Sequence, residues 1–161
     1  MSVGYIEELR KLVGSRPLIL AGAAVLIVDN AACVLLQRRA DNKLWGLPGG
    51  FMEPGERSEE TARREVREEL GLEVGELALL GVFSGPELYR KYENGDEVLM
   101  VCAAYVTRDV KGDLRLDLSE ASEAKFFELS SLPVEINPPD KLILAKFIDD
   151  VRMIESLMKR E

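Results

Sequence analysis

The chain opens with apolar residues at helical spacing and continues with runs typical of buried strands. Residues 5–13 (YIEELRKLV) repeat apolar positions every three or four residues, and Gly14 predicts the end of this short helix. The run over 18–28 is too apolar for an exposed element, and Asp29 begins a turn before a second apolar run, CVLLQRR. The pattern therefore predicts an N-terminal helix followed by a buried hairpin.

A second helix is predicted from about residue 59 to residue 70. Ser58 is a suitable N-cap, two glutamates follow it in the first turn, and Gly71 is a typical residue at the end of a helix. The preceding segment, LWGLPGGFMEPGER, is rich in glycine and proline, which indicates irregular backbone. We therefore expect a loop that leads directly into a helix.

The rest of the chain predicts further strands and a closing helix. Strand-like composition covers 72–83, 98–110 and 124–129, and the Asn-Gly pair at 94–95 favours a turn. From about 139 to 159 apolar residues return at near-helical spacing. Helices and strands interleave irregularly, which favours a mixed sheet with helices on its faces.

The length of 161 residues is typical of one domain, and the chain contains no internal repeat or linker-like stretch. We expect a single domain with an N-terminal helical extension (1–16), a core (17–137) and a C-terminal helix (138–161). No stretch is long and apolar enough to span a bilayer, and the first residues lack the apolar part of a secretory signal. A cytoplasmic protein without membrane contact is expected.

Composition excludes several classes of function. A formal net charge of -8 disfavours a broad nucleic-acid surface, because phosphates would be repelled. The chain has no histidine, which excludes Ser-His-Asp and Cys-His catalysis and HExxH zinc sites. Cys33 and Cys102 lie in apolar runs and are expected to be buried thiols, not a disulfide. Any proton acceptor is then expected to be a carboxylate.

Three acids crowd one face of the second predicted helix. At about 100° per residue, Glu65, Glu68 and Glu69 lie together beside an apolar stripe that would face the core. Like charges at this spacing oppose helix formation, although neighbouring arginines could offset them in a solvent-exposed lattice of ion pairs. The other explanation is a divalent cation. Glutamate oxygens without histidine or cysteine favour Mg²⁺, or Mn²⁺, over zinc.

Residues 50–72 resemble the Nudix box, the signature of the Nudix hydrolase family. The box is a glycine, five residues, a glutamate, seven residues, then Arg-Glu, an aliphatic residue, any residue, Glu-Glu, any residue, glycine and an aliphatic residue. Every defined position is filled, by Gly50, Glu56, Arg64, Glu65, Val66, Glu68, Glu69, Gly71 and Leu72. The resemblance implies an α/β/α sandwich with a central mixed sheet and a loop-helix-loop active site. It also implies metal-dependent hydrolysis of a nucleoside diphosphate linked to a group X.

The resemblance assigns roles to residues of this segment. The three clustered glutamates match the metal-binding glutamates of the family, and Gly49 matches a residue whose carbonyl oxygen can contact the metal. Glu56 and Arg64 match positions that orient the site through a charge network. The missing side chain of Gly50 would let its backbone approach the substrate closely. For the glycine pair, a simple tight turn is the alternative.

The general base and the substrate contacts lie outside the box. In the family the base is a box glutamate or one on a separate loop, and Glu120 or Glu123 is a candidate here, with Glu120 favoured of the two and a plain surface glutamate as the alternative for each. Of Arg38 and Arg39, at the end of a predicted strand, alternation allows one to reach a substrate phosphate.

Aromatic residues are the candidates for contact with a base. Tyr89 and Tyr92 lie in a polar loop and could stack on a base, whereas Trp45 is expected to pack above the glycine loop. Pro86 lies where some ADP-ribose pyrophosphatases carry proline, but Tyr89 lies where dinucleoside polyphosphate hydrolases tend to carry tyrosine. ADP-ribose-like compounds, dinucleoside polyphosphates and nucleoside triphosphates therefore stay open as substrates.

Two classes of function are compatible with the resemblance. One is a magnesium-dependent hydrolase in which water attacks phosphorus, and the other is a Nudix-like module that senses a nucleotide without turning it over. The complete set of glutamates favours the enzyme. A homodimer through the N-terminal helix or the sheet is also compatible with the sequence.

Overall fold

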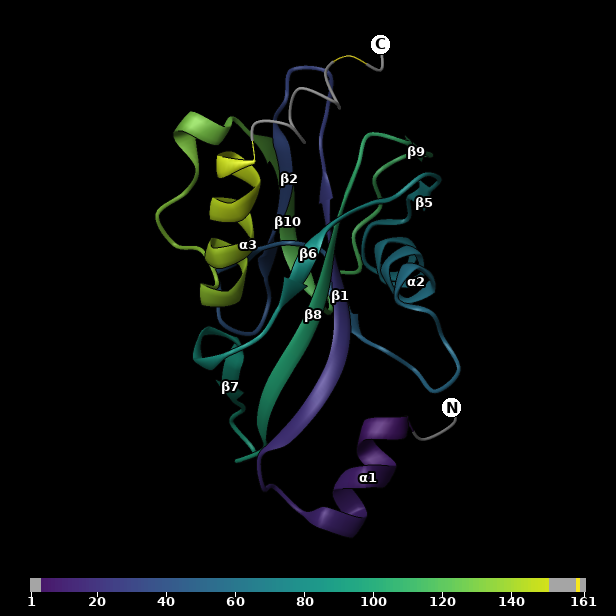
Figure 1. Ribbon diagram of the computed structural model, residues 1–161, viewed down its shortest axis with the longest axis vertical. Helices are drawn as coiled ribbons and strands as arrows, with labels where there is room; N and C mark the ends of the chain where they lie inside the picture. The colour runs from purple at the N-terminus through teal and green to yellow at the C-terminus, as the bar shows by residue number, and fades with distance from the viewer. Residues whose placement is uncertain (1–3, 151–158, 160–161) are drawn as a thin grey trace.

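Three α-helices and ten strands make up the described part of the chain, residues 4–150 and 159 of a computed structural model (Figure 1). The helices are α1 (Tyr5–Val13), α2 (Ser58–Leu70) and α3 (Pro138–Asp149), with short 3₁₀ helices η1 (Pro86–Leu88) and η2 (Leu129–Ser131). The strands are β1 (Leu18–Ile27), β2 (Val34–Arg39), β3 (Trp45–Gly46), β4 (Gly49–Phe51), β5 (Glu73–Val74), β6 (Ala78–Phe83), β7 (Tyr89–Lys91), β8 (Glu97–Thr107), β9 (Val110–Lys111) and β10 (Ala121–Phe127).

The largest sheet is mixed. Its strand order is β4-β1-β8-β6, and β7 also pairs with β8. β1 and β8 run parallel along the whole of β1, whereas β4, β6 and β7 pair with their neighbours in antiparallel fashion. A second, antiparallel sheet has the order β10-β2-β3, and β5 and β9 form a short third one. The predicted mixed sheet is therefore confirmed.

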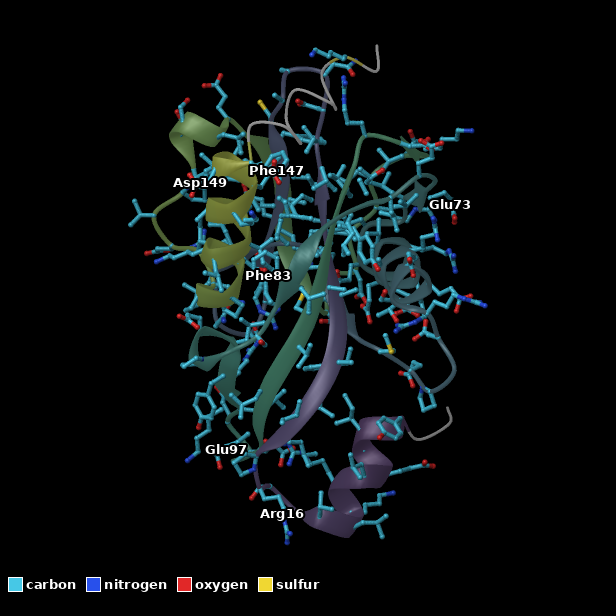
Figure 2. All side chains as sticks on the ribbon, viewed as in Figure 1. Arg16, Glu73, Phe83, Glu97, Phe147 and Asp149 are labelled. Carbon is cyan, nitrogen blue, oxygen red and sulfur yellow. The ribbon has the colours of Figure 1, made fainter. Side chains whose placement is uncertain are left out.

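Alternate residues of β1 face opposite sides of the sheet and pack against different helices. Val25 and Ile27 belong to one apolar cluster with residues of α2, and Leu26 belongs to another with residues of α3. Figure 2 shows Phe147 of α3 near the strands, where it is buried in the second cluster. Helices on both faces of a central mixed sheet confirm the predicted α/β/α sandwich.

The predicted buried hairpin is only partly correct. The turn exists, because Oδ1 of Asp29 accepts hydrogen bonds from the backbone N–H groups of Ala31 and Cys33. Beyond one bridge between Val28 and Val34, however, the two strands separate into different sheets. β1 is buried on both faces over most of its length, so it occupies a central position between β4 and β8 instead of pairing with β2.

α2 begins one residue earlier than predicted and ends where predicted. Arg57, not Ser58, is the N-cap, and its backbone N–H donates to Oε2 of Glu60 over 2.8 Å. The Ser58 hydroxyl instead contacts the hydroxyl of Tyr105. Gly71 ends the helix in the left-handed conformation, with φ of 70°, which glycine adopts without strain.

The two ends of the described chain are helical. α1 matches the helix predicted over 5–13, and none of its residues is buried. α3 coincides with the first part of the helix predicted over 138–161, of which 151–158 and 160–161 lie outside the described residues. No helix in the described ranges is long and apolar enough to cross a bilayer.

Of the three side chains predicted to be structural, Trp45 and Cys102 are buried as expected. Trp45 is buried and meets Phe127 edge to face, with ring centroids 4.9 Å apart. Cys33 and Cys102 are both free thiols, Cys102 buried and Cys33 half-buried. The predicted absence of a disulfide between them is confirmed, and the burial of Cys33 is only partial.

Candidate functional site

A cavity of about 440 Å³ lies beside the acidic face of α2. Glu65, Glu68 and Glu69 line one end of it together with Gly49 and Gly50 of β4. The other end is lined by side chains that come from distant parts of the chain, namely Arg39, Asp41, Arg90, Tyr92, Asn137 and Asp140. The fold therefore joins the predicted acidic cluster to a second polar region in one cavity.

Glu69 is the most deeply buried of the three glutamates. Its Oε2 accepts hydrogen bonds of 3.0 Å from Nε2 of Gln37 and from the backbone N–H of Gly49. Burial raises the pKa of Glu69 to about 8, and the nearby Glu65 adds to the rise, whereas the two hydrogen bonds oppose it. The carboxyl is thus fixed between α2, β2 and β4, where a negative charge is costly without a cation.

Glu65 packs directly on Gly50. A Cβ atom at position 50 would lie 2.5 Å from the carboxyl carbon of Glu65, so a larger residue would displace this carboxylate. Burial raises the pKa of Glu65 to about 7, and the neighbouring Arg64 opposes the rise. Glu68, in contrast, keeps 57% of its side chain exposed. The three carboxylates therefore form a series of increasing exposure, from buried Glu69 through Glu65 to Glu68.

Arg64 connects the loop before α2 to the acidic face. Its Nε and Nη2 donate to the two carboxylate oxygens of Glu56 over 2.8 and 3.0 Å, and Nη2 also donates to the Phe51 carbonyl. Nη1 donates to Glu65 over 2.9 Å and to Glu68 over 3.2 Å. The hydrogen bonds from Arg64 are the main reason that the pKa of Glu56 is lowered. Arg64 thereby holds the loop and orients two of the carboxylates.

The donor atoms at this face suit a hard divalent cation. Oε2 of Glu65, Oε1 of Glu68 and Oε1 of Glu69 accept no hydrogen bond from the residues that the structure describes. Across 4–150 and 159, however, no three acidic, histidine or cysteine side chains already form a group that could hold an ion. Glu65 and Glu68 each give one oxygen to Arg64, which leaves the other oxygen of each carboxylate available to an ion. Carboxylate oxygens alone fit Mg²⁺ or Mn²⁺.

Glu120 lies at the same cavity as the acidic face. It lines the cavity, and its charge contributes to the raised pKa of both Glu65 and Glu69. Its loop is attached to α2, because the backbone N–H of Asp117 donates to the carbonyl of Glu69 over 3.0 Å. Asp117 also lines the cavity and was missed by the sequence analysis, which had no signal for this contact. Glu123 is absent from the described cavity wall.

The polar end of the cavity contains one of the two predicted arginines. Arg39 lines the cavity and donates to the two carboxylate oxygens of Asp41 over 3.0 and 2.9 Å. Arg38 points elsewhere: its Nε donates to the carbonyl of Lys43, and its Nη2 lies 3.9 Å from Glu135. As the alternation of strand residues predicts, one arginine of the pair faces the cavity.

Residues of β7 and the following turn extend the cavity toward a neighbouring hollow of about 630 Å³. Arg90 forms an ion pair with Asp41 and lies over the ring of Tyr92, 4.5 Å from its centroid. Arg90 and Tyr92 line both the cavity and the hollow, whereas Tyr89 lines the hollow and donates its hydroxyl to Glu97 over 2.6 Å. Of the two tyrosines singled out in the sequence, Tyr92 is the one at the cavity.

Asp140 is a buried carboxylic acid of the cavity wall that the sequence analysis missed. It lies in the first turn of α3 and accepts a hydrogen bond of 3.2 Å from Nδ2 of Asn137, the N-cap. Burial raises the pKa of Asp140 to about 6, and the hydrogen bond from Asn137 opposes the rise. The sequence signal was the asparagine followed by two prolines, a typical helix start.

Comparisons with known proteins agree on one family. The NUDIX domain model matches residues 19–150. An ADP-ribose pyrophosphatase from Methanocaldococcus jannaschii is 35% identical over 120 residues, which are 73% of this chain and 67% of that protein. The nucleoside triphosphatase NudI of Salmonella schwarzengrund is 54% identical over 50 residues, 28% of this chain and 36% of that protein. The crystal structure of a MutT NUDIX hydrolase from Burkholderia pseudomallei covers 80% of this chain and 98% of its own, with a TM-score of 0.69 and 26% identity.

Proposed function

Because the chain belongs to the Nudix family and is a Nudix pyrophosphohydrolase, we propose that it cleaves the phosphoanhydride of a nucleoside diphosphate linked to a group X. Water attacks one phosphorus, the P–O bond of the anhydride breaks, and a nucleoside monophosphate and the phosphate of X are released. The observation that supports this proposal is the presence of Glu65, Glu68 and Glu69 at one cavity, with the Arg64–Glu56 pair behind them.

The three glutamates of α2 are proposed to hold Mg²⁺, with Mn²⁺ as an alternative. When bound, such an ion would neutralise charge on the phosphates and stabilise the transition state. Glu69 is held in place by Gln37 and Gly49, and Glu65 by Arg64, so the protein positions two of the donors in advance. Through its carbonyl oxygen, Gly49 is proposed as a further ligand.

Glu120 is proposed as the general base. It lines the cavity close enough to Glu65 and Glu69 to affect their pKa values, and it lies on a separate loop, so it can face a water molecule that approaches from that side. Its carboxylate would accept the proton that the attacking water loses. Among the carboxylates of the cavity, it is the one from outside the box that the sequence also favoured.

The substrate is proposed to extend from the acidic end of the cavity toward its polar end. Arg39 is placed to donate to a phosphate oxygen, and the backbone of Gly50 lies beside Glu65 at the acidic end, where it can approach the substrate closely. Tyr92 with Arg90 offers a surface for a base or sugar of X. Tyr89, in the neighbouring hollow, is proposed to contact the far end of a long substrate.

ADP-ribose-like compounds rank first among the proposed substrates. The relative named an ADP-ribose pyrophosphatase matches 73% of this chain, whereas the nucleoside triphosphatase matches 28%. The hollow that continues from the cavity also offers room for a second sugar or base, which a nucleoside triphosphate lacks. Nucleoside triphosphates and dinucleoside polyphosphates are the competing candidates.

Product analysis by chromatography tests the function. The purified protein is incubated with ADP-ribose, diadenosine tetraphosphate and dGTP, each with Mg²⁺, with Mn²⁺ and with EDTA. We expect metal-dependent release of a nucleoside monophosphate, fastest from ADP-ribose. Tight binding without cleavage under every condition would favour a nucleotide sensor instead of an enzyme.

Glu69→Gln tests the metal site directly. The substitution keeps the shape of the side chain but removes a ligand charge, so turnover should fall by several orders of magnitude while the fold stays intact. Glu73→Gln is the matched control, because Glu73 is exposed and pairs with Arg67 on the surface. Unchanged turnover in Glu69→Gln would overturn the assignment of the metal ligands.

A further inference from the structure

Two arginines at the polar end of the cavity converge on one carboxylate, that of Asp41. Arg39 donates from Nε and Nη2 to its two oxygens, and Nη2 of Arg90 donates to Oδ2 from β7. β7 lies beside the start of α3, far along the chain from the turn that carries Asp41 (Figure 1). Burial raises the pKa of Asp41, but the hydrogen bonds from Arg39 and Arg90 outweigh it and hold this pKa well below its ordinary value. The carboxylate therefore stays ionised.

The turn after β2 fixes the position of Asp41. The backbone N–H of Asn42 donates to Oδ1 of Asp41 over 2.7 Å. The backbone N–H of Ala40 donates to the carbonyl of Glu120 over 2.9 Å, which ties the turn to the loop of the proposed base. Asp41 nevertheless keeps 47% of its side chain exposed and lines both the cavity and the neighbouring hollow. A carboxylate on a braced turn that is open to the cavity is placed to meet a ligand.

Ion pairing leaves the polar end with little positive charge to offer. Its wall contains two arginines and two carboxyl groups, those of Asp41 and Asp140. The charge of Arg39 acts on Asp140 as well as on Asp41. Nη1 of Arg39 accepts no such commitment: it has no hydrogen-bond partner within 4–150 and 159, so it is free for one phosphate contact. A further phosphate in the polar end would meet two carboxyl groups besides the paired arginines.

The polar atoms that remain available in this end suit hydroxyl groups. A carboxylate oxygen only accepts hydrogen bonds, so a sugar hydroxyl can donate to it, whereas an ionised phosphate cannot. Acidic side chains bind ribose hydroxyls in dinucleotide sites for the same reason. The ring of Tyr92, which lines the cavity beside Arg90, adds an apolar surface for the carbon atoms of a sugar.

We propose that Asp41 determines which group X is accepted: by holding Arg39 and Arg90, it makes the polar end favour a neutral sugar over a further phosphate. This specificity rests on the proposed hydrolysis, with the anhydride at the acidic end of the cavity and X at the polar end. ADP-ribose and ATP form a matched pair of substrates, because both are ADP linked to a group X, which is a ribose in one and a phosphate in the other. The wild type is expected to prefer ADP-ribose.

Asp41→Asn tests the specificity, because it keeps the shape of the side chain but removes the charge that holds the two arginines. We would measure kcat/KM for ATP and for ADP-ribose at constant free Mg²⁺. The ratio of the first to the second should rise at least about tenfold, since guanidinium groups become available to the terminal phosphate. Asp113→Asn is the matched control: it removes the same charge at an exposed position outside the described cavity wall, and its ratio should stay within about twofold of the wild type.

Binding of inorganic phosphate gives a second measurement, which needs no turnover. In isothermal titration calorimetry with EDTA present, Asp41→Asn should bind phosphate at least about tenfold more tightly than the wild type. Adding Arg39→Gln to this variant should remove the gain. If the wild type hydrolyses neither nucleotide, the proposed function fails, and the phosphate titration still decides what Asp41 does.

An unchanged ratio in Asp41→Asn overturns the proposal. An equal fall for both substrates does so too, because it would mean that Asp41 only fastens the turn after β2 to β7. Equal phosphate affinity in Asp41→Asn and the wild type, or an equal effect of Asp113→Asn, has the same consequence. Circular dichroism checks that the variants fold, and Asp41→Ser takes the place of Asp41→Asn if the latter does not.

Discussion

Arg38 and Arg39 are neighbours on β2, yet Arg39 alone of the two lines the cavity. Arg39→Gln should lower kcat/KM about ten- to a hundredfold, because a hydrogen bond to a charged group contributes about 1.5–3 kcal/mol. The loss should fall mainly on KM. Arg38→Gln is the matched control and should stay within about twofold of the wild type. Steady-state kinetics on the best substrate would contradict this placement if both variants lost the same activity.

The same pair shows what the sequence can predict about single residues. Alternation along a strand is a local property, so it correctly predicts that the two side chains face opposite ways. Which of them faces the cavity depends on the neighbours of β2, here β10 and β3. The roles of Asp41 and Arg90 depend on their mutual ion pair across 49 positions, which no local pattern reveals.

The start of α3 contains a titratable group that links this element to the cavity. The folded-state pKa of Asp140 is about 6, above its ordinary value of 3.8, and burial is the main cause. Between these two values the unfolded chain has lost the proton while the folded protein retains it, so rising pH favours unfolding. The stability that the neutral carboxyl preserves is fully present below about pH 4 and is lost as pH rises through about 6.

Asp140→Asn should remove this dependence. Between pH 4 and pH 7 the free energy of unfolding of the wild type should fall by about 2 kcal/mol because Asp140 loses its proton. The variant has no carboxyl at this position and should not show this fall. Urea unfolding at both pH values measures the difference. Asp149→Asn, at an exposed position of the same helix, should follow the wild type at both. If the free energies of unfolding of Asp140→Asn and of the wild type differed by the same amount at both pH values, Asp140 would titrate normally in the folded protein.

Elements differ in how far the sequence predicts them. α2 is set by local signals, a glycine that ends it, acids in its first turn and an apolar stripe, so its limits were predicted to within a residue. The hairpin of β1 and β2 was predicted from a turn that does exist, but strand partners are chosen by burial across the whole sheet. β7 was predicted as a loop because its three residues, Tyr-Arg-Lys, show no apolar alternation.

At the scale of the whole molecule, the parallel pairing of β1 with β8 brings distant segments to one cavity. The box, the 117–120 loop and the start of α3 meet there because the sheet between the two helices fixes their positions. The box alone predicted the acidic end of the cavity. The polar end was predicted only through Arg39 and Tyr92, since its residues lie on three separate segments without a shared motif.

The net charge of -8 should make catalysis sensitive to salt. An acidic surface repels an anionic nucleotide, and salt weakens this repulsion because the Debye length shortens from about 30 Å at 0.01 M to about 8 Å at 0.15 M. At constant free Mg²⁺, kcat/KM should therefore rise a few-fold, roughly two to five times, over this range. Initial rates at low substrate concentration, with NaCl and KCl compared, measure the effect. A fall in kcat/KM would show that Arg39 and Arg90 dominate the field at the cavity entrance and attract the substrate against the overall charge.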